Sequence, residues 1–550
     1  MPTEPSSRGF ARLLWRLADL VQVAETRRSF RAKAYRAAVW ALDDLPSLDA
    51  PDDVVLGVPG IGPGILSLIG EYRHSGHLSQ LIPLEQAYPA QAARLRRLPR
   101  MTPRILRDLK GELGIETPGD LVDAIESGAA LTIRGVGAQT LDLWVEVLSL
   151  LRDDFSAPAH RAWVMASEMA SHVTRHIHAE VAIAGEVRRV EEWVTRLDLV
   201  VVTQGRPAAA RFLDSSAALE SVAAASDLRV EAIGHGGIPL AFHLAGPDAA
   251  GSVMVAATGP PAHAALFADL PPAKSEGDAY SQAALPWIPP PARSLPIEQA
   301  VGVVTVGDLR GDLHLHSDGS PDGRMTIETI LETATARGYE YVLITDHTRG
   351  LRFGGLTEDD LAAQSGMIEA LRPRYPDLVV FHGAELNIER DGTLDIDDEA
   401  LSQLDFAVAG VHSHFGLEEG EQTERVLAAL RHPKVRVLAH PFGRRIGIRP
   451  PLDIDMERVV EEAVTNGVAL ESNGHRDRLD LPAEWVRRAV DLGAIFAANS
   501  DAHRVPEMAN IANAVGTLQR AGVTSDRVIN AASVDDLRAW IGSAGSAGRG

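Results

Sequence analysis

The sequence predicts a multidomain protein: an all-α region over residues 1–150, an α/β segment over 155–270 and a C-terminal parallel α/β barrel over 305–540. Apolar residues recur at helical spacing in the first region, and short apolar runs alternate with helical stretches in the last. Residues 271–304 are rich in Pro, Ala and Ser and are typical of a linker. The Gly- and Ser-rich tail, 541–550, is expected to be disordered.

Composition limits the kinds of protein that this chain can be. It has 550 residues, of which 45% are hydrophobic and 23% charged, enough for several separate cores. No apolar run is long enough to predict a membrane span. Because cysteine is absent, disulfides and thiolate metal sites are excluded, and the composition fits a reducing cytoplasm. Any metal site must therefore use His, Asp and Glu.

The distribution of charge bears on nucleic-acid binding. A net charge of −22 argues against a nucleic-acid partner. However, residues 1–150 carry 17 Lys and Arg against 18 Asp and Glu, whereas the rest carries 36 against 57. The acidity thus lies where a carboxylate-rich metal site is expected. The near-neutral first region can still hold a local basic face, with candidates Arg94, Arg96, Arg97, Arg100, Arg104, Arg107 and Lys110.

Two glycine-rich turns, at 58–64 and 133–138, precede helical stretches in the first region. A Gly-x-Gly turn lets the backbone bend tightly and exposes amide N–H groups at a helix N-terminus, where they can hold a phosphate. Such contacts ignore base identity. The turns resemble helix-hairpin-helix motifs, although purely structural turns remain the alternative. The resemblance implies DNA binding through Gly60, Gly62, Gly64, Gly135 and Gly137.

Histidines gather in the last region. Ten of the 19 lie between His314 and His503, most of them where apolar runs end. About seven such runs are expected to be strands, and almost all end in His, Asp or Glu. In a parallel α/β barrel the loops after the strands form the site, so these residues should converge. Imidazole and carboxylate ligands suit Zn, Mn or Fe, and so many ligands suit two or three ions that promote phosphoryl transfer to water.

Short motifs in this region resemble the polymerase and histidinol phosphatase (PHP) family. They are His-Leu-His at 314–316, Ser-Pro-Asp-Gly at 320–323, Thr-Asp-His at 345–347, Gly-Ala-Glu at 383–385, Val-His-Ser at 411–413, Ala-His-Pro at 439–441 and Ser-Asp-Ala-His at 500–503. The resemblance implies a (β/α)7 PHP barrel with nine metal ligands: His314, His316, Asp322, His347, Glu385, His412, His440, Asp501 and His503. Among these, the candidate catalytic residues are Glu385, Asp501 and His412.

Other residues near these motifs are candidates for supporting roles. The segment after His316 is one residue longer than the usual pattern, so Asp318 is an alternative to Asp322. Asp346 and His414 are expected to support the ligands or face the substrate. Three arginines could hold phosphate, with a solvated surface role equally open: Arg349, Arg444 and Arg445.

The order of the regions, together with Arg31–Ala38 and Leu285–Pro290, resembles bacterial family X DNA polymerases that carry a C-terminal PHP domain. This implies a helix-hairpin-helix domain, then a nucleotidyltransferase-like palm, then a shortened thumb over 271–304. A working palm needs three carboxylates that hold two metals. Here Arg196 stands at the first position and the third falls on Ala241, so only Asp198 remains. We therefore expect a palm remnant without polymerase activity.

Two further departures agree with this expectation. Glu186 replaces a serine that would help to bind a triphosphate, and residues 64–70 contain none of the lysines expected of a lyase. The sequence as a whole predicts a DNA-repair-type metal-dependent phosphoesterase. The resemblance implies that it acts as a 3′–5′ exonuclease or processes abasic sites and 3′-phosphates. We expect it to use two or three divalent ions (Mn, Zn or Fe).

The expected partner is gapped or nicked DNA, bound without sequence preference. We expect a monomer, and nothing in the sequence predicts a protein partner. Two alternatives stay open: an active family X gap-filling polymerase with 3′–5′ exonuclease activity, and a small-molecule phosphatase of the histidinol phosphatase type.

Overall fold

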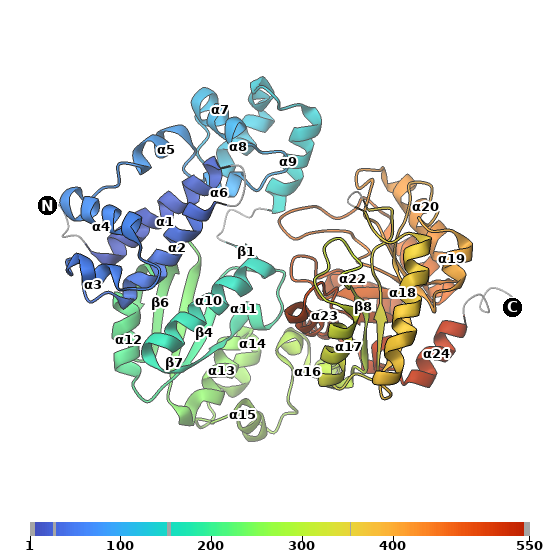
Figure 1. Cartoon of the computed structure of the whole chain (residues 1–550). Coiled ribbons are helices and arrows are strands. Elements are labelled where there is room, and N and C mark those ends of the chain that lie inside the picture. Colours follow the sequence, from blue (N-terminus) through green and yellow to red (C-terminus); the bar gives the residue numbers. More distant parts are fainter. Residues whose placement is uncertain (1–5, 26–28, 151–155, 352–353, 544–550) are drawn as a thin grey trace. The chain divides into compact units, whose positions relative to one another are not determined.

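The computed structural model describes residues 6–25, 29–150, 156–351 and 354–543; most of the predicted disordered tail lies outside these ranges. The chain divides into two compact units, Met1–Leu285 and Pro286–Gly550 (Figure 1). The division falls inside the segment that the sequence predicts as a linker. Among the described helices, none has the length and apolar character needed to cross a bilayer.

The first unit begins with helices, as the sequence predicts. Side-chain caps fix where several of them start: Ser6 accepts a hydrogen bond from the Gly9 amide, and Thr117 forms a capping box with Asp120. The helices are α1 (Ser7–Ala24), α2 (Phe30–Ala41), α3 (Asp52–Leu56), α4 (Pro63–Ser75), α5 (Leu81–Ala87), α6 (Ala92–Leu95), α7 (Pro103–Leu113), α8 (Pro118–Glu126) and α9 (Ala138–Leu150).

A five-stranded mixed sheet follows in the same unit, in the order β2-β4-β7-β6-β5. Only β4 and β7 are parallel neighbours; the other pairs are antiparallel. The strands are β2 (Glu180–Ile183), β4 (Leu197–Val202), β5 (Leu219–Ala225), β6 (Arg229–Gly234) and β7 (Pro239–Ala245), with a separate pair β1 (Ala157–Pro158) and β3 (Trp193–Val194). The helices are α10 (Ala159–Ile177), α11 (Gly185–Arg188), α12 (Arg206–Ser215), α13 (Ala250–Thr258), α14 (Pro261–Ala264) and α15 (Glu276–Gln282).

A buried carboxylate joins the helical part of this unit to the sheet. Asp43, in the short 3₁₀ helix η1 (Leu42–Asp44), lies 2.8 Å from His172 Nε2 and accepts hydrogen bonds from the Ser216 hydroxyl and the Ala217 amide. Burial alone would raise the pKa of Asp43, but these contacts outweigh it and hold the pKa below its ordinary value. The two parts therefore pack as one unit.

The described part of the second unit contains eight strands, and every neighbouring pair within its two sheets is parallel. One sheet has the order β10-β9-β8 and the other β11-β12-β13-β14-β15. Single parallel bridges, Leu315 to Ala502 and His347 to Glu385, link the two sheets. The strands are β8 (Gly311–Leu315), β9 (Tyr341–Ile344), β10 (Val379–His382), β11 (Glu385–Asn387), β12 (Ala407–Gly410), β13 (Val435–Leu438), β14 (Ala469–Asn473) and β15 (Phe496–Asn499).

Each of the seven predicted strand runs contains an observed strand, and the third run is split between β10 and β11. Helices surround the strands, with α17 and α18 beside β8 in Figure 1. They are α16 (Ile297–Ala300), α17 (Ile327–Ala336), α18 (Glu358–Leu371), α19 (Asp398–Ser402), α20 (Glu419–Leu430), α21 (Met456–Asn466), α22 (Ala483–Asp491), α23 (Ile511–Arg520) and α24 (Val534–Gly542). Their apolar faces pack on the strands through buried residues such as Ile330, Leu427, Val460 and Leu518.

Candidate metal centre

The strand ends of the second unit bring the nine predicted ligands to one place. One comes from β8, one from β11, and the others from the residues that follow β8, β9, β12, β13 and β15. Ligand atoms of seven of the nine form three overlapping groups, in each of which all atoms lie within 4.8 Å of one another. The groups are His316 with His347 and His503, His314 with His316 and Asp501, and His347 with Glu385 and His412.

Glu385 lies at the middle of the cluster and is 1% exposed. Its Oε1 lies 2.9 Å from His412 Nε2 and 2.9 Å from His440 Nε2. Burial alone would raise the pKa of Glu385, but the surrounding imidazoles hold it well below its ordinary value. Two oxygens facing different rings give the arrangement of a bridging ligand. The rings that face Oε2 are His347 at 2.9 Å, His314 at 3.2 Å and His316 at 3.4 Å.

Asp501 also divides its oxygens between two sides. Its Oδ1 lies 3.3 Å from His316 Nε2 and 3.7 Å from His503 Nδ1. Its Oδ2 accepts a hydrogen bond of 3.0 Å from Asn473 Nδ2 and lies 3.4 Å from Arg478 Nε. Asp501 has φ 53°, in the left-handed region that few non-glycine residues adopt and that occurs often at functional sites. One oxygen is thus held by the protein, and the other faces the imidazoles.

Several buried atoms of the cluster lack hydrogen-bond partners among the described residues, and this shows whether metal ions would fit here. Within the described part of the chain, seven atoms of the nine residues are buried and make no hydrogen bond, two of them Nδ1 of His412 and His440. The other five lie within 4.0 Å of an atom of another ligand: Nε2 of His314, His316 and His503, Nδ1 of His347, and Oε2 of Glu385. Leaving such atoms unpaired costs free energy, and native proteins rarely do so. Because they face a common centre and are all suitable ligands, divalent metal ions would satisfy them together.

Glu471 contacts two of the ligands, His314 and His440, and was not among the residues predicted from the sequence. This carboxylate lies within β14, is fully buried, and lies 2.6 Å from His314 Nδ1. It also accepts hydrogen bonds from the His440 amide at 2.7 Å and from Asn473 and Asn499. A carboxylate bonded to the second ring nitrogen fixes the orientation of a metal-binding histidine. Its place at the end of an apolar run was visible in the sequence, but the nine-ligand pattern did not require it.

Asp346 organises the loop after β8. It accepts hydrogen bonds from the Ser317 amide at 2.7 Å, the Ser320 hydroxyl at 2.7 Å and Gln364 Nε2 at 2.6 Å. Ser320 Oγ in turn lies 3.1 Å from His316 Nδ1 and accepts from the His347 amide. Asp346 thus acts on two ligands through Ser320, which agrees with the supporting role expected from the sequence.

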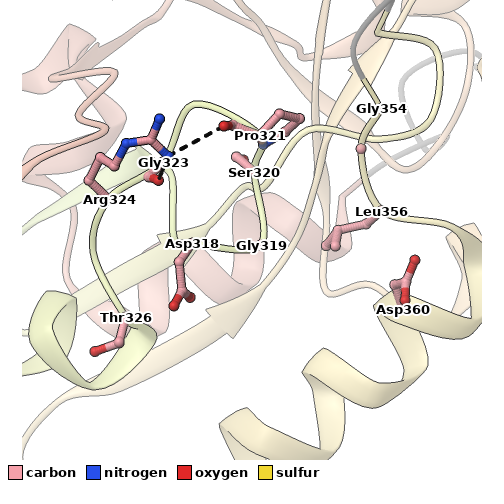
Figure 2. A pocket seen from close by; sticks show the side chains of 11 residues that line it. Asp318, Gly319, Ser320, Pro321, Gly323, Arg324, Thr326, Gly354, Leu356 and Asp360 are labelled. Carbon is pink, nitrogen blue, oxygen red and sulfur yellow. Dashed lines mark hydrogen bonds between the residues drawn. The ribbon is translucent and has the colours of Figure 1, made fainter.

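The same loop carries the two alternative aspartates. Asp322 Oδ1 lies 3.4 Å from His503 Nε2 and 4.0 Å from His347 Nε2, at the exposed rim of the cluster. Neither aspartate belongs to the three groups, and Asp318 lines an adjacent cavity of about 680 Å³ (Figure 2). The loops 318–326 and 354–360 form this cavity, with Arg324 on one side and Asp360 on the other. The geometry therefore favours Asp322 over Asp318 as the ligand.

The three arginines that the sequence offered for phosphate binding are engaged elsewhere. Arg349 bonds to Glu358 and to the Asp395 carbonyl, Arg444 bonds to the carbonyls of Arg478 and Leu479, and Arg445 bonds to Asp477. His414 is exposed, with φ 53°. The arginine that reaches a ligand is Arg478, which the sequence prediction did not name.

The two hairpin turns lie in the first unit. Gly60 and Gly135 have φ of 96° and 92°, a conformation that glycine adopts at little cost. Gly62 is the N-cap of α4, and α9 begins directly after Gly137. A Cβ built on Gly62, Gly64 or Gly137 meets no atom within 4 Å, so the backbone there is open to a ligand.

The palm positions lie together on the sheet. Asp198 of β4 pairs in register with Ala241 of β7. Arg196 Nε donates to Asp198 Oδ1 at 3.0 Å, and His243 Nε2 lies 2.9 Å from the same oxygen. Glu186 accepts hydrogen bonds from Thr195 and from the Arg196 amide. The one carboxylate among the three aligned positions is thus paired with an internal cation.

Replacing Glu471 by Gln should weaken metal binding, because His314 loses the carboxylate that orients its ring. We expect about a 10- to 100-fold loss of affinity for Mn²⁺. The check is the Mn²⁺ content of the purified protein at graded metal concentrations. The matched control is Glu424→Gln on α20, a surface residue 2.7 Å from Arg458, which should leave the metal content unchanged. Equal metal content in the two variants would contradict the role given to Glu471.

The similarity of this chain to known proteins covers most of its length. No family model matches it. The chain is 29% identical over 544 residues to the DNA polymerase/3′-5′ exonuclease PolX of Bacillus subtilis (strain 168), covering 93% of this chain and 95% of the relative. It is 30% identical over 238 residues to a probable phosphatase of Syntrophotalea carbinolica, covering 40% of this chain and 90% of the relative. A probable phosphatase of Edwardsiella ictaluri is 28% identical over 233 residues, covering 89% of that relative.

The first match runs through both units, and the phosphatases match the C-terminal part that contains the histidine cluster. The chain is therefore similar over nearly its whole length to a bacterial family X DNA polymerase, and its C-terminal part is similar to PHP-type phosphatases.

Proposed function

We propose that the second unit is a metal-dependent phosphoesterase that hydrolyses phosphate esters in DNA. The observation that supports this most is the convergence of five buried, unpartnered ligand atoms from different strands on one centre. We take β10 and β11 as one strand interrupted at Gly383 and Ala384, which gives a seven-stranded (β/α)7 barrel. The proposed ligands are the nine residues predicted from the sequence, with Asp322 at the rim.

The chemistry follows from what the side chains hold in place. Two or three divalent ions, of Mn, Zn or Fe, would supply an activated water and stabilise the oxygens of an in-line displacement. Glu385 would bridge neighbouring ions, because each of its oxygens faces separate imidazoles. Asp501 would present Oδ1 while Asn473 holds Oδ2. His412, which is more exposed than His314 or His316, would face the substrate.

DNA is the proposed substrate because of the first unit. Open hairpin amides at Gly62, Gly64 and Gly137 can accept backbone phosphates without reading bases. The Bacillus subtilis relative is named as a 3′-5′ exonuclease. We propose the same polarity here, on gapped or nicked DNA, with abasic or 3′-phosphate ends as further substrates. The phosphatase relatives favour a second candidate, a small-molecule phosphatase that acts on phosphomonoesters.

We also propose that template-directed polymerisation is lost. Arg196 bonds to the single remaining carboxylate, Asp198, and the methyl group of Ala241 cannot bind a metal. Arg188, which could otherwise hold a triphosphate, bonds to Glu276 Oε1 at 3.0 Å. The charges that nucleotide binding requires are thus absent or neutralised within the protein, and the palm would serve as a scaffold.

Nuclease activity is tested with the full chain, Mn²⁺ and a gapped duplex labelled at its 3′ or its 5′ end. We expect removal of the 3′ label first. The double substitution His314→Ala/His316→Ala should lower the rate more than about a hundredfold, because two buried ligands are lost. A chelator should abolish cleavage, and added Mn²⁺ should restore it. His432→Ala, which removes a histidine beside Asp398 outside the cluster, is the control.

Two results would contradict this proposal. Cleavage that survives the double substitution would show that the nuclease site lies elsewhere. Hydrolysis of small phosphomonoesters without any cleavage or binding of DNA would favour the phosphatase candidate instead.

Polymerase activity is tested by extension of a primer on a gapped template with Mg²⁺ or Mn²⁺. We expect no incorporation, because one carboxylate paired with Arg196 cannot hold two metal ions. The Bacillus subtilis relative, run under the same conditions, is the positive control. Incorporation that Asp198→Ala removes would show that the palm is active.

The hairpins are tested by placing carboxylates beside the open amides. We expect Gly62→Glu/Gly137→Glu to weaken DNA binding roughly tenfold at low salt, because like charges repel across the interface. The matched control is Gly70→Glu/Gly111→Glu, in α4 and α7, where a Cβ also meets nothing within 4 Å. Fluorescence anisotropy with a labelled duplex measures both. Equal losses would mean that only net charge matters, and would remove the hairpins from the DNA interface.

A further inference from the structure

Arg478 combines a ligand contact with an unsatisfied donor. It lies between β14 and α22, and its side chain is 18% exposed. Its Nε lies 3.4 Å from Asp501 Oδ2, while its Nη1 is buried and makes no hydrogen bond to any described residue. A guanidinium stays charged and offers five donors, so a buried donor without an acceptor is costly. The structure leaves this donor available to a ligand.

A second arginine lies next to it. The guanidinium of Arg449 lies over the Phe415 ring at 3.8 Å from its centroid, and Nε donates to the Gly443 carbonyl at 2.8 Å. Phe415 follows the ligand His412 by three residues. Burial, and then the neighbouring charge of Arg478, lowers the pKa of Arg449 to about 10. Two like charges are therefore held close together beside the histidine cluster.

Two other arginines of the same unit, Arg425 and Arg445, are bonded differently. Arg425 donates to the carbonyls of Ile388, Glu389 and Ser413, so that its Nε, Nη1 and Nη2 all have acceptors. Arg445, beside Arg449, is neutralised by Asp477. Arg449 has no ion pair with a carboxylate among the described residues, and Arg478 leaves Nη1 unpaired. Packing alone does not account for this pair.

We propose that Arg478 and Arg449 form an oxyanion subsite that binds the phosphate group of the substrate at the metal centre. A tetrahedral oxyanion supplies acceptors for Nη1 and a further negative charge beside the two guanidinium groups. Arg478 would then have two roles: its Nε positions the ligand Asp501, and its Nη1 binds the phosphate. The identification of that phosphate as part of a DNA substrate rests on the proposed function.

The test uses the full chain loaded with Mn²⁺ and inorganic phosphate as the probe, with calorimetry for affinity and elemental analysis for metal content. We expect Arg478→Gln to weaken phosphate binding about 10- to 100-fold at unchanged metal content, since a charged hydrogen bond is lost. Arg478→Lys should recover part of the affinity. The control is Arg488→Gln on α22, an exposed partner of Glu484, which should bind phosphate like the unaltered protein.

Arg449→Gln provides a second measurement, which decides the matter if Arg478→Gln does not fold. We expect a similar weakening, because Arg449 is half-buried and supplies the other charge. Unchanged phosphate affinity in the folded variants would overturn the subsite. Loss of metal in Arg478→Gln, combined with unchanged phosphate affinity in Arg449→Gln, would also overturn it, because Arg478 would then act through Asp501 alone.

These outcomes are separable from the proposed function. If phosphate binding depends on the two arginines but DNA is not cleaved, the subsite stands and the DNA activity fails. If DNA is cleaved while phosphate binding ignores both arginines, the proposed function stands and the subsite fails.

Discussion

A single buried carboxylate, Glu385, determines how the second unit is built around its centre. A negative charge with 1% exposure is tolerable only where positive or polar partners surround it. The partners are imidazoles from β8 and from the loops after β9, β12 and β13, so separate strands must end at one level to supply them. Glu471 is a second buried carboxylate, which contacts His314 Nδ1 and the His440 amide. The two carboxylates together hold these ligands in position.

Much of the metal centre could be predicted from the positions of its ligands at the ends of predicted parallel strands. His314 and His316 alternate along one strand, and Glu385 ends an apolar run, so their convergence follows from a parallel arrangement. Glu471 and Arg478 could not be assigned, because their roles depend on which neighbours the sheet order places beside them. The same limit explains the arginines offered for phosphate binding: only the folded loops show that Arg444 and Arg445 bond within the protein. The hairpin glycines were visible because their conformation is local.

Two features of the fold depend on contacts between distant segments. The third predicted strand is split after His382, where Gly383 packs so closely that a Cβ would lie 2.6 Å from the Phe406 carbonyl. In the first unit, Asp43 bonds across to His172, Ser216 and Ala217, and Arg8 bonds to the Ser216 carbonyl. These bonds merge helices and sheet into one compact body, whereas the composition alone predicts separate regions.

The register between β4 and β7 separates the backbone from the side chains. Asp198 and Ala241 are paired, and the ladder runs unbroken from Leu197 to Val202. The sheet is therefore regular at the positions where the carboxylates of a two-metal site would stand, although only one carboxylate is present there. Main-chain hydrogen bonds place few demands on the side chains that project from a sheet. Backbone shape alone is accordingly a poor guide to which site in such a chain is active.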